Sequence, residues 1–163
     1  MAEPWVINAS PVILLAKAGL IQHVPALAQQ LVVPEPVAEE IRQCRTADAA
    51  VNWINGAGRS FVQPPVSELA SLRGAKIGSG ERSVISWAAV HRGFIALLDD
   101  HGARVFAERM DVPVLGSVGV ILRLKRAGLA PAVKPHLLDI RNAGGYIGEK
   151  LFSEALRNAG EEP

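Results

Sequence analysis

The stretch VINASPVILLAKAGL, residues 6–20, changes from one hydrophobic pattern to another within a few positions. Residues 5–7 form a short apolar run that is typical of a buried strand, whereas residues 11–18 have the apolar spacing of a helix. Ser10 is expected to cap this helix, because a hydroxyl followed by proline is a common helix start. Asn8 remains as a polar residue at the end of a strand, which indicates either a turn or a functional site.

The same alternation of strand and helix continues along the chain. Further strands are predicted at residues 31–33, 60–62, 94–98 and 112–115. Further helices are predicted at residues 35–44, 47–54, 66–72, 81–91, 103–110, 117–127, 131–142 and 148–158. Strands that alternate with helices imply crossover connections. The sequence therefore predicts an α/β fold with three layers, α/β/α, around a central, mainly parallel sheet of about five strands.

Composition narrows the class of protein. The 163 residues fit one domain with one core, and only the tail at 161–163 is expected to be disordered. Cys44 is the single cysteine, which excludes an intrachain disulfide and a zinc site built on paired thiolates. No apolar run approaches the roughly 20 residues that cross a bilayer, and the N-terminal stretch is a poor signal peptide. We expect a cytoplasmic protein with no membrane partner.

Acidic side chains and one amide follow the predicted strands or lie on the predicted helices after them. In parallel α/β sheets, ligands bind outside the carboxyl ends of the strands. The residues selected by this rule are Asn8, Glu39, Glu40, Glu81, Asp99 and Asp100. Each also has a simpler interpretation as a turn, a helix cap or a solvated residue. Clustered oxygen donors suit Mg²⁺ or a similar hard cation, which activates water for phosphodiester hydrolysis.

Two other phosphate chemistries fit the sequence less well. A phosphoacceptor receiver domain also has an acid pair at a strand end, but the predicted strand near 61–63 supplies no further aspartate. The segment 78–81 lacks the Gly-Lys-Ser/Thr of a phosphate-binding loop. Residues 117–150 carry six basic and two acidic side chains. This excess either contacts phosphates or forms the solvated side of amphipathic helices.

Five segments resemble the PIN-domain family in their order and spacing. They are VINASPVILLAKAGL (6–20), VVPEPVAEEI (32–41), IGSGERSVISWA (77–88), ALLDDHGARVFAERMDVPVLGSVGVILRLKRAGL (96–129) and VKPHLLDIRNAGGYIGEKLFSEAL (133–156). The resemblance is to short prokaryotic PIN-like proteins of the toxin–antitoxin type. It implies a single PIN-like domain over residues 1–163, with C-terminal helices from about 117 to 158.

The resemblance also implies a metal-dependent endoribonuclease that uses Mg²⁺ or Mn²⁺, as the toxin of a toxin–antitoxin pair. The positions that match the acidic residues of the family are Asn8, Glu40, Glu81 and Asp100. Asp99 is expected as a neighbouring metal ligand. The residues expected to bind RNA are Ser10, Arg123, Lys125 and Arg126. The partners expected are RNA, a small antitoxin protein and a second copy of the chain.

Asn8 departs from the family pattern, which has an aspartate at this position. An amide still offers a carbonyl oxygen to a metal, but it lacks the charge that favours a dication and cannot act as a base. The alternative interpretation is therefore a degenerate, non-catalytic PIN domain that binds RNA or a protein partner.

Overall fold

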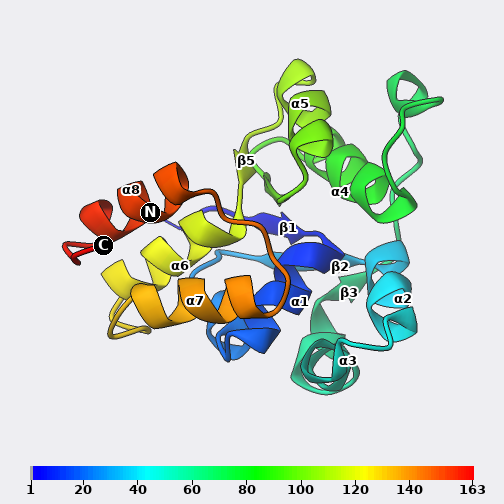
Figure 1. Ribbon diagram of the computed structural model, residues 1–163. Helices are drawn as coiled ribbons and strands as arrows, with labels where there is room; N and C mark the ends of the chain where they lie inside the picture. The colour runs from blue at the N-terminus through cyan, green and yellow to red at the C-terminus, as the bar shows by residue number, and fades with distance from the viewer. Residues whose placement is uncertain (1) are drawn as a thin grey trace.

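A five-stranded, all-parallel sheet forms the centre of the computed structural model, which describes residues 2–163 (Figure 1). The strand order is β3-β2-β1-β4-β5. The strands are β1 (Trp5–Ile7), β2 (Leu31–Pro34), β3 (Val62–Gln63), β4 (Ile95–Leu97) and β5 (Val114–Leu115). The α/β class and the parallel sheet predicted from the sequence are confirmed.

Helices cover both faces of this sheet. They are α1 (Ala9–Lys17), α2 (Glu35–Gln43), α3 (Asp48–Asn55), α4 (Ser79–Val90), α5 (His101–Arg109), α6 (Ser117–Arg126), α7 (Lys134–Asn142) and α8 (Glu149–Asn158). Figure 1 shows α4 and α5 on one side of the sheet and α1, α6 and α7 on the other. Within residues 2–163, no helix combines the length and apolar character needed to cross a bilayer.

The strand order reverses beside β1, and this reversal positions the polar residues. From β1 the chain passes through α1 to β2 on one side, whereas β4, on the other side of β1, continues through α5 to β5. Ile7 pairs with Leu97, and the backbone N–H of Asn8 donates to the carbonyl oxygen of Leu97 at 3.1 Å. The residues that follow β1 and β4 therefore emerge next to each other, where parallel α/β folds bind ligands.

The start of α1 differs from the prediction. The helix begins at Ala9, so Asn8 and not Ser10 occupies the cap position, and the Asn8 side chain makes no capping hydrogen bond. Proline is tolerated throughout a first helical turn, whose N–H groups have no acceptor within the helix, so Pro11 did not fix the first residue. Ser10 consequently lies inside the helix with its side chain exposed.

The segment from 57 to 72 is also less regular than predicted. Residues Ala57–Phe61 form a 3₁₀ helix in place of the start of the expected strand. Gly58 lies so close to Trp53 that a Cβ there would be 2.6 Å from the indole ring, which requires glycine. A single 3₁₀ turn, Ala70–Leu72, replaces the helix predicted at 66–72.

Glu161 is held in place, although the sequence predicted a disordered tail. Its carboxylate accepts a hydrogen bond from Lys125 Nζ at 2.7 Å and from the backbone N–H groups of Val133 and Lys134 at 2.6 and 3.0 Å. Lys125 belongs to α6, while Lys134 begins α7. Glu161, which follows α8, thus connects the last three helices. The sequence of the tail contains no local pattern that predicts these contacts.

We expect Glu161→Gln to destabilise the protein by about 2 kcal/mol at neutral pH. Burial alone would raise the pKa of Glu161, but the hydrogen bonds from Lys125, Val133 and Lys134 outweigh it and hold this pKa at about 2, below the value of 4.5 without such contacts. A lowered pKa means that the contribution is present above pH 4.5 and lost as the pH falls toward 2.

Urea denaturation at a series of pH values measures this effect. The Glu161→Gln variant should lose stability at neutral pH and should show a weaker acid dependence than the unchanged protein. Glu162→Gln is the matched control, because the exposed neighbour forms none of these contacts. Equal unfolding curves for Glu161→Gln and Glu162→Gln at pH 7 would contradict the prediction.

Candidate functional site

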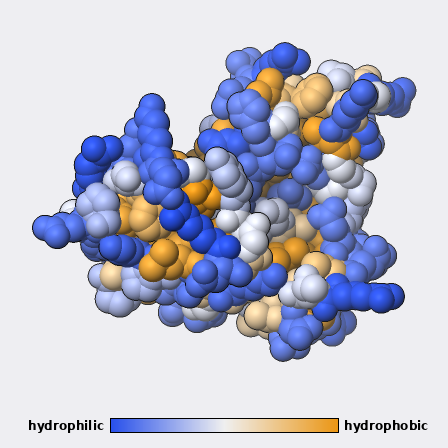
Figure 2. Space-filling model, in the orientation of Figure 1, coloured by the Kyte–Doolittle hydropathy of each residue, from blue (hydrophilic) through white to orange (hydrophobic). Residues whose placement is uncertain are grey.

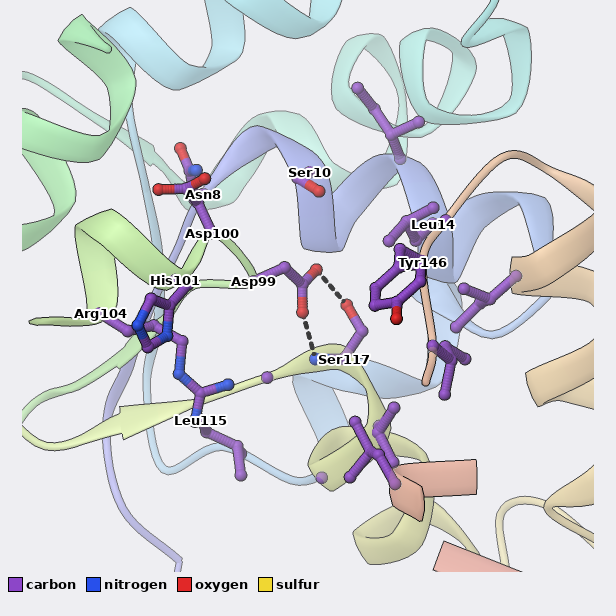
Figure 3. A pocket seen from close by; sticks show the side chains of 18 of the residues that line it. Asn8, Ser10, Leu14, Asp99, Asp100, His101, Arg104, Leu115, Ser117 and Tyr146 are labelled. Atoms are coloured by element: carbon purple, nitrogen blue, oxygen red, sulfur yellow. Dashed lines mark hydrogen bonds between the residues drawn. The ribbon is translucent and has the colours of Figure 1, made fainter. Parts of the chain in front are cut away.

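A cleft of about 840 Å³ opens at the carboxyl ends of β1 and β4. Side chains from α1, α4, α5 and α6 and from the segment between α7 and α8 line it. Of the residues predicted to form a site, Asn8, Ser10, Glu81, Asp99 and Asp100 line this cleft. Figure 3 shows how several of them face its interior.

Asn8 contributes an oxygen that has no partner within residues 2–163. The residue is 4% exposed, and its Oδ1 is buried without a hydrogen bond. A Cβ on Gly80 would lie 3.2 Å from this atom and 3.5 Å from Glu40 Oε2, so both oxygens face the same space above the start of α4. A buried carbonyl oxygen without a donor costs about 1–3 kcal/mol. Asn8 Oδ1 is thus placed to accept a cation, a water or a ligand hydroxyl.

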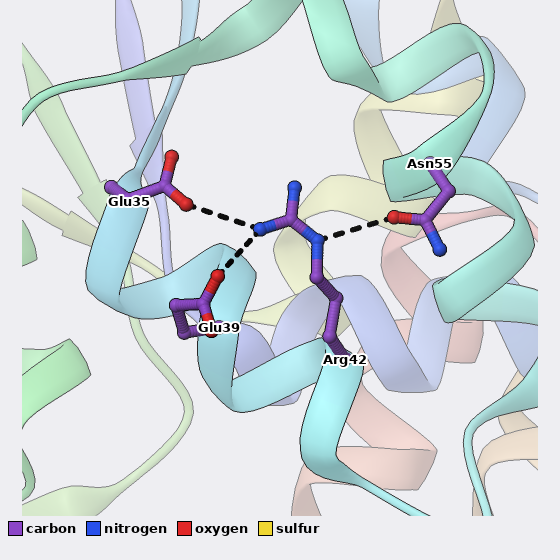
Figure 4. Close-up of polar contacts among 4 residues, drawn as sticks. All are labelled: Glu35, Glu39, Arg42 and Asn55. Carbon is purple, nitrogen blue, oxygen red and sulfur yellow. Dashed lines mark hydrogen bonds and ion pairs between the residues drawn. The ribbon is translucent and has the colours of Figure 1, made fainter.

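Glu40 and its neighbour Glu39 have different surroundings. Arg42 Nη1 contacts Glu39 Oε1 at 2.8 Å and Glu35 Oε1 at 3.1 Å, and Arg42 Nε donates to Asn55 Oδ1 at 3.1 Å (Figure 4). These contacts connect α2 to α3 and neutralise the outward-facing acids. The Glu40 carboxylate instead lies against α4, and burial raises its pKa.

Glu81 lies within electrostatic reach of two other acids. It occupies the first turn of α4, where its Oε2 accepts a hydrogen bond from the Gly78 N–H at 3.3 Å. Burial is the main cause that raises the pKa of Glu81, followed by the negative charge of Asp100 and then by that of Glu40. The hydrogen bond from Gly78 and the charge of Arg82 act in the opposite direction. Glu40 and Asp100, from two other elements, therefore both lie close enough to act on the charge of Glu81.

The adjacent aspartates point in different directions (Figure 3). Asp100 Oδ2 caps α5 by accepting the backbone N–H of Ala103 at 2.9 Å, and its side chain lies on the side of Asn8. Asp99 accepts the backbone N–H of Ser117 at 2.8 Å and the Ser117 hydroxyl at 2.6 Å. Asp99 thus fixes the start of α6 with both oxygens. Asp100, Glu40 and Glu81 are called the acidic group below.

Glu40, Glu81, Asp100 and Asn8 offer oxygen atoms, which are the type of ligand that a hard dication prefers. Within residues 2–163, no three His, Cys, Asp or Glu side chains approach closely enough to hold an ion by themselves. Mg²⁺ does not require this, since it commonly takes one or two carboxylates and keeps several waters. The unpartnered Asn8 Oδ1, and the Glu40 and Glu81 carboxyls whose pKa values burial raises, are groups that a bound cation would favour.

Three of the predicted RNA-binding residues lie elsewhere. Arg123 pairs with Glu3 at 2.9 Å and lies over the Trp5 ring, at the amino end of β1. Arg126 lines a smaller cleft there with Glu3 and Trp5, and Lys125 is bound to Glu161. The acidic cleft begins at the opposite end of β1, so these side chains do not share it.

Three other basic side chains line the acidic cleft and are not among the site residues predicted from the sequence. They are Lys17, His101 and Arg104. From residue 2 to residue 163, the structure shows no ion pair and no side-chain hydrogen bond for any of them. Spacing offered a signal, because Lys17 follows Ser10 by two helical turns and Arg104 follows Asp100 by one, which places each on the same helix face as the site residue.

Because the pKa values of Glu40 and Glu81 are raised, the cation-free protein should lose stability as the pH rises. A carboxyl group with a raised folded-state pKa stabilises the fold below its unfolded pKa, and this contribution disappears as the pH passes through the folded value. A dication bound at about 100 times its Kd should add about 2.7 kcal/mol at pH 7, or roughly 5–10 °C in Tm.

Thermal unfolding with Mn²⁺ and with EDTA at pH 4.5 and pH 7 measures this effect. The Mn²⁺ shift should be present at pH 7, small at pH 4.5 and reduced in Glu81→Gln. Glu108→Gln, an exposed position on α5, is the matched control. An equal Mn²⁺ shift in Glu81→Gln and the unchanged protein would contradict the placement of the cation.

A family model described as a PIN domain matches residues 4–161, which is nearly the whole chain. No curated protein matches the chain.

Proposed function

The chain belongs to the PIN-domain family, and from this premise we propose that it is a metal-dependent endoribonuclease whose active site is the acidic cleft. One observation carries the proposal. Glu81 lies within electrostatic reach of both Glu40 and Asp100, and the unpartnered Asn8 Oδ1 and Glu40 Oε2 both lie beside Gly80, near the strand ends where parallel α/β folds bind ligands.

The proposed reaction uses Glu40, which lies beside the cleft, and several polar residues that line it. Glu40, Glu81 and Asp100 would hold Mg²⁺ or Mn²⁺, with the neutral oxygen of Asn8 beside them. When bound, the ion supplies a Lewis acid and a water of lowered pKa for attack on a phosphodiester. Ser10, exposed in the first turn of α1, donates a hydrogen bond to a phosphate oxygen. Asp99 positions this side of the cleft by holding the start of α6.

Cleavage of an end-labelled single-stranded RNA tests the proposal. The purified chain should cut the RNA with Mn²⁺ or Mg²⁺ and should leave it intact with EDTA. A PIN nuclease of known activity, assayed in parallel, serves as the positive control. If that control cuts the RNA and this chain does not under any of these conditions, the nuclease assignment fails.

The proposal extends to a toxin of a toxin–antitoxin pair, supported by the resemblance to short prokaryotic PIN-like proteins. Its partners would then be RNA, a small antitoxin protein and a second copy of the chain. Induced expression should arrest growth, and the Asp100→Asn variant should not. Light scattering on the purified protein determines whether it forms a dimer.

A non-catalytic PIN domain that binds RNA or a protein is the second candidate. It is favoured by the neutral Asn8 and by the absence, among residues 2–163, of three acids that approach as a ready metal group. The Asn8→Asp variant described in the Discussion separates the two functions.

A further inference from the structure

The acidic cleft continues into an apolar half that the proposed chemistry does not use. Leu14 of α1, Leu122 of α6 and Leu151 of α8 line this half together with Tyr146. The Tyr146 residue is 95% exposed although its side chain faces the cleft beside Leu14 (Figure 3). Figure 2 shows exposed hydrophobic residues beside the hollow that separates α5 from α6 and α7. A large aromatic ring is thus presented to solvent in the same cleft as Glu81 and Asp100.

The backbone around Tyr146 is fixed, in contrast to its free ring. The Gly145 N–H donates to the carbonyl oxygen of Ile140 at 2.9 Å, and a Cβ on Gly145 would lie 2.6 Å from Ile140 Cγ2. On the other side, Arg141 Nη2 donates to the carbonyl oxygen of Ile147 at 3.0 Å, and Ile147 is buried. Core packing explains these neighbours and leaves the Tyr146 ring without a structural role.

Positive charge lies in the same cleft. Lys17, His101 and Arg104 line it, and the structure of residues 2–163 shows no acidic partner within ion-pair distance for them. A Cβ on Gly116 would lie 3.0 Å from Arg104 Nη1, which places this guanidinium on the floor of the cleft near Asp99. A ligand that complements this basic and apolar part of the cleft therefore carries negative charge next to Lys17 and Arg104 and also has a flat apolar surface.

We propose that the apolar half of the cleft holds an unpaired nucleobase stacked on Tyr146, with Lys17 and Arg104 at the phosphates that flank it. This inference rests on the proposed function and assigns a base-binding subsite to it. Stacking on an aromatic side chain strengthens binding by about 5- to 150-fold per base and tolerates any base. A base inside a duplex has no free face, so Tyr146 selects unpaired nucleotides over paired ones.

Fluorescence anisotropy in EDTA measures binding without cleavage. The probes are a labelled hexamer of RNA, the same strand in a duplex, and hexamers with one abasic site at each position in turn. Tyr146→Leu should weaken hexamer binding by about 5- to 150-fold, and Tyr146→Phe, which keeps the ring, should bind within twofold of the unchanged protein. Leu138→Ala, an exposed apolar residue of α7 outside the cleft, is the matched control.

A double-mutant comparison separates stacking from a general loss of affinity. One abasic position should weaken binding to the unchanged protein and should have little further effect on Tyr146→Leu. Lys17→Gln should lower the slope of log binding constant against log salt concentration by about the amount that one phosphate contact contributes. Tyr146→Leu should weaken binding by the same factor whether or not Lys17 is replaced.

Several results would overturn the subsite: no binding of the hexamer, equal binding by Tyr146→Leu and the unchanged protein, or a duplex bound as tightly as the single strand. Equal binding would assign the apolar half to another ligand, such as a protein segment. Failure of the nuclease assignment looks different. A chain that binds RNA through Tyr146 but never cleaves keeps the subsite, whereas a chain that cleaves equally well with Tyr146→Leu loses only the subsite.

Discussion

Asp100→Asn is expected to reduce RNA cleavage by about 10³-fold, or about 4 kcal/mol of transition-state stabilisation, while the protein stays folded. The substitution removes one of the three proposed carboxylate ligands and leaves a neutral amide in a site that already includes the neutral amide of Asn8. Two carboxylates are a weaker site for a dication than three. The loss should appear in kcat, in the metal concentration needed for half activity, or in both.

The fold should survive because asparagine caps helices as well as aspartate does. Asp100 Oδ2 accepts the Ala103 N–H at the start of α5, and an asparagine Oδ1 accepts the same hydrogen bond. The unfolding free energy should therefore change by less than about 1 kcal/mol. Asp111→Asn, at an exposed position with a positive φ of 56° that asparagine adopts readily, is the matched control. Cleavage by Asp100→Asn at the unchanged rate would remove this residue from the site.

Asn8→Asp should lower the stability of the protein without a dication and raise it with one. Without one, the new carboxylate is buried beside Glu40, Glu81 and Asp100, and we expect the unfolding free energy to fall by about 2 kcal/mol. The N-terminus of α1 favours a negative charge there by up to about 1 kcal/mol, which offsets only part of this cost. With Mn²⁺, the added charge should tighten metal binding by about tenfold and raise the Tm above that of the unchanged protein.

Activity of the Asn8→Asp variant decides between the two proposed functions. A catalytic domain cleaves RNA with Asn8 and cleaves faster with aspartate, whereas a degenerate domain cleaves only in the variant. Calorimetric titration with Mn²⁺ and RNA cleavage assays measure both quantities. Asn52→Asp, at an exposed position of α3, controls for the charge change alone. If Asn8→Asp neither gains metal affinity nor loses stability in EDTA, the oxygen of Asn8 does not face the acidic group.

The sequence predicted the elements whose causes are local. Strands β1 and β4 are buried on both faces and read as continuous apolar runs, which made them recognisable and placed Asn8 and Asp100 at their ends. Glu40 and Glu81 follow from the same rule of ligand binding at strand ends. The sequence could not show which neighbouring acid turns inward, because the Arg42 contacts to Glu39 and the Ser117 contacts to Asp99 are tertiary.

Long-range contacts that local patterns cannot show fix several of these side chains. Lys125 is bound by Glu161, although 36 residues separate them. Arg123 forms its ion pair with Glu3 across 120 residues. Tyr146 lies in a glycine-rich segment with no helix or strand pattern, so nothing in its surroundings marked it as the exposed wall of a cleft.

The cap that Asp100 places on α5 gives the cleft a built-in spectroscopic reporter. The amide proton of Ala103 is held by the same carboxylate that would face a bound ion, so its NMR resonance and exchange rate depend on how that carboxylate is used. The amide proton of Ser117 is held by the adjacent Asp99, outside the acidic group, and provides an internal reference. Two peaks in one spectrum thus distinguish occupancy of the acidic group from a general change in the protein.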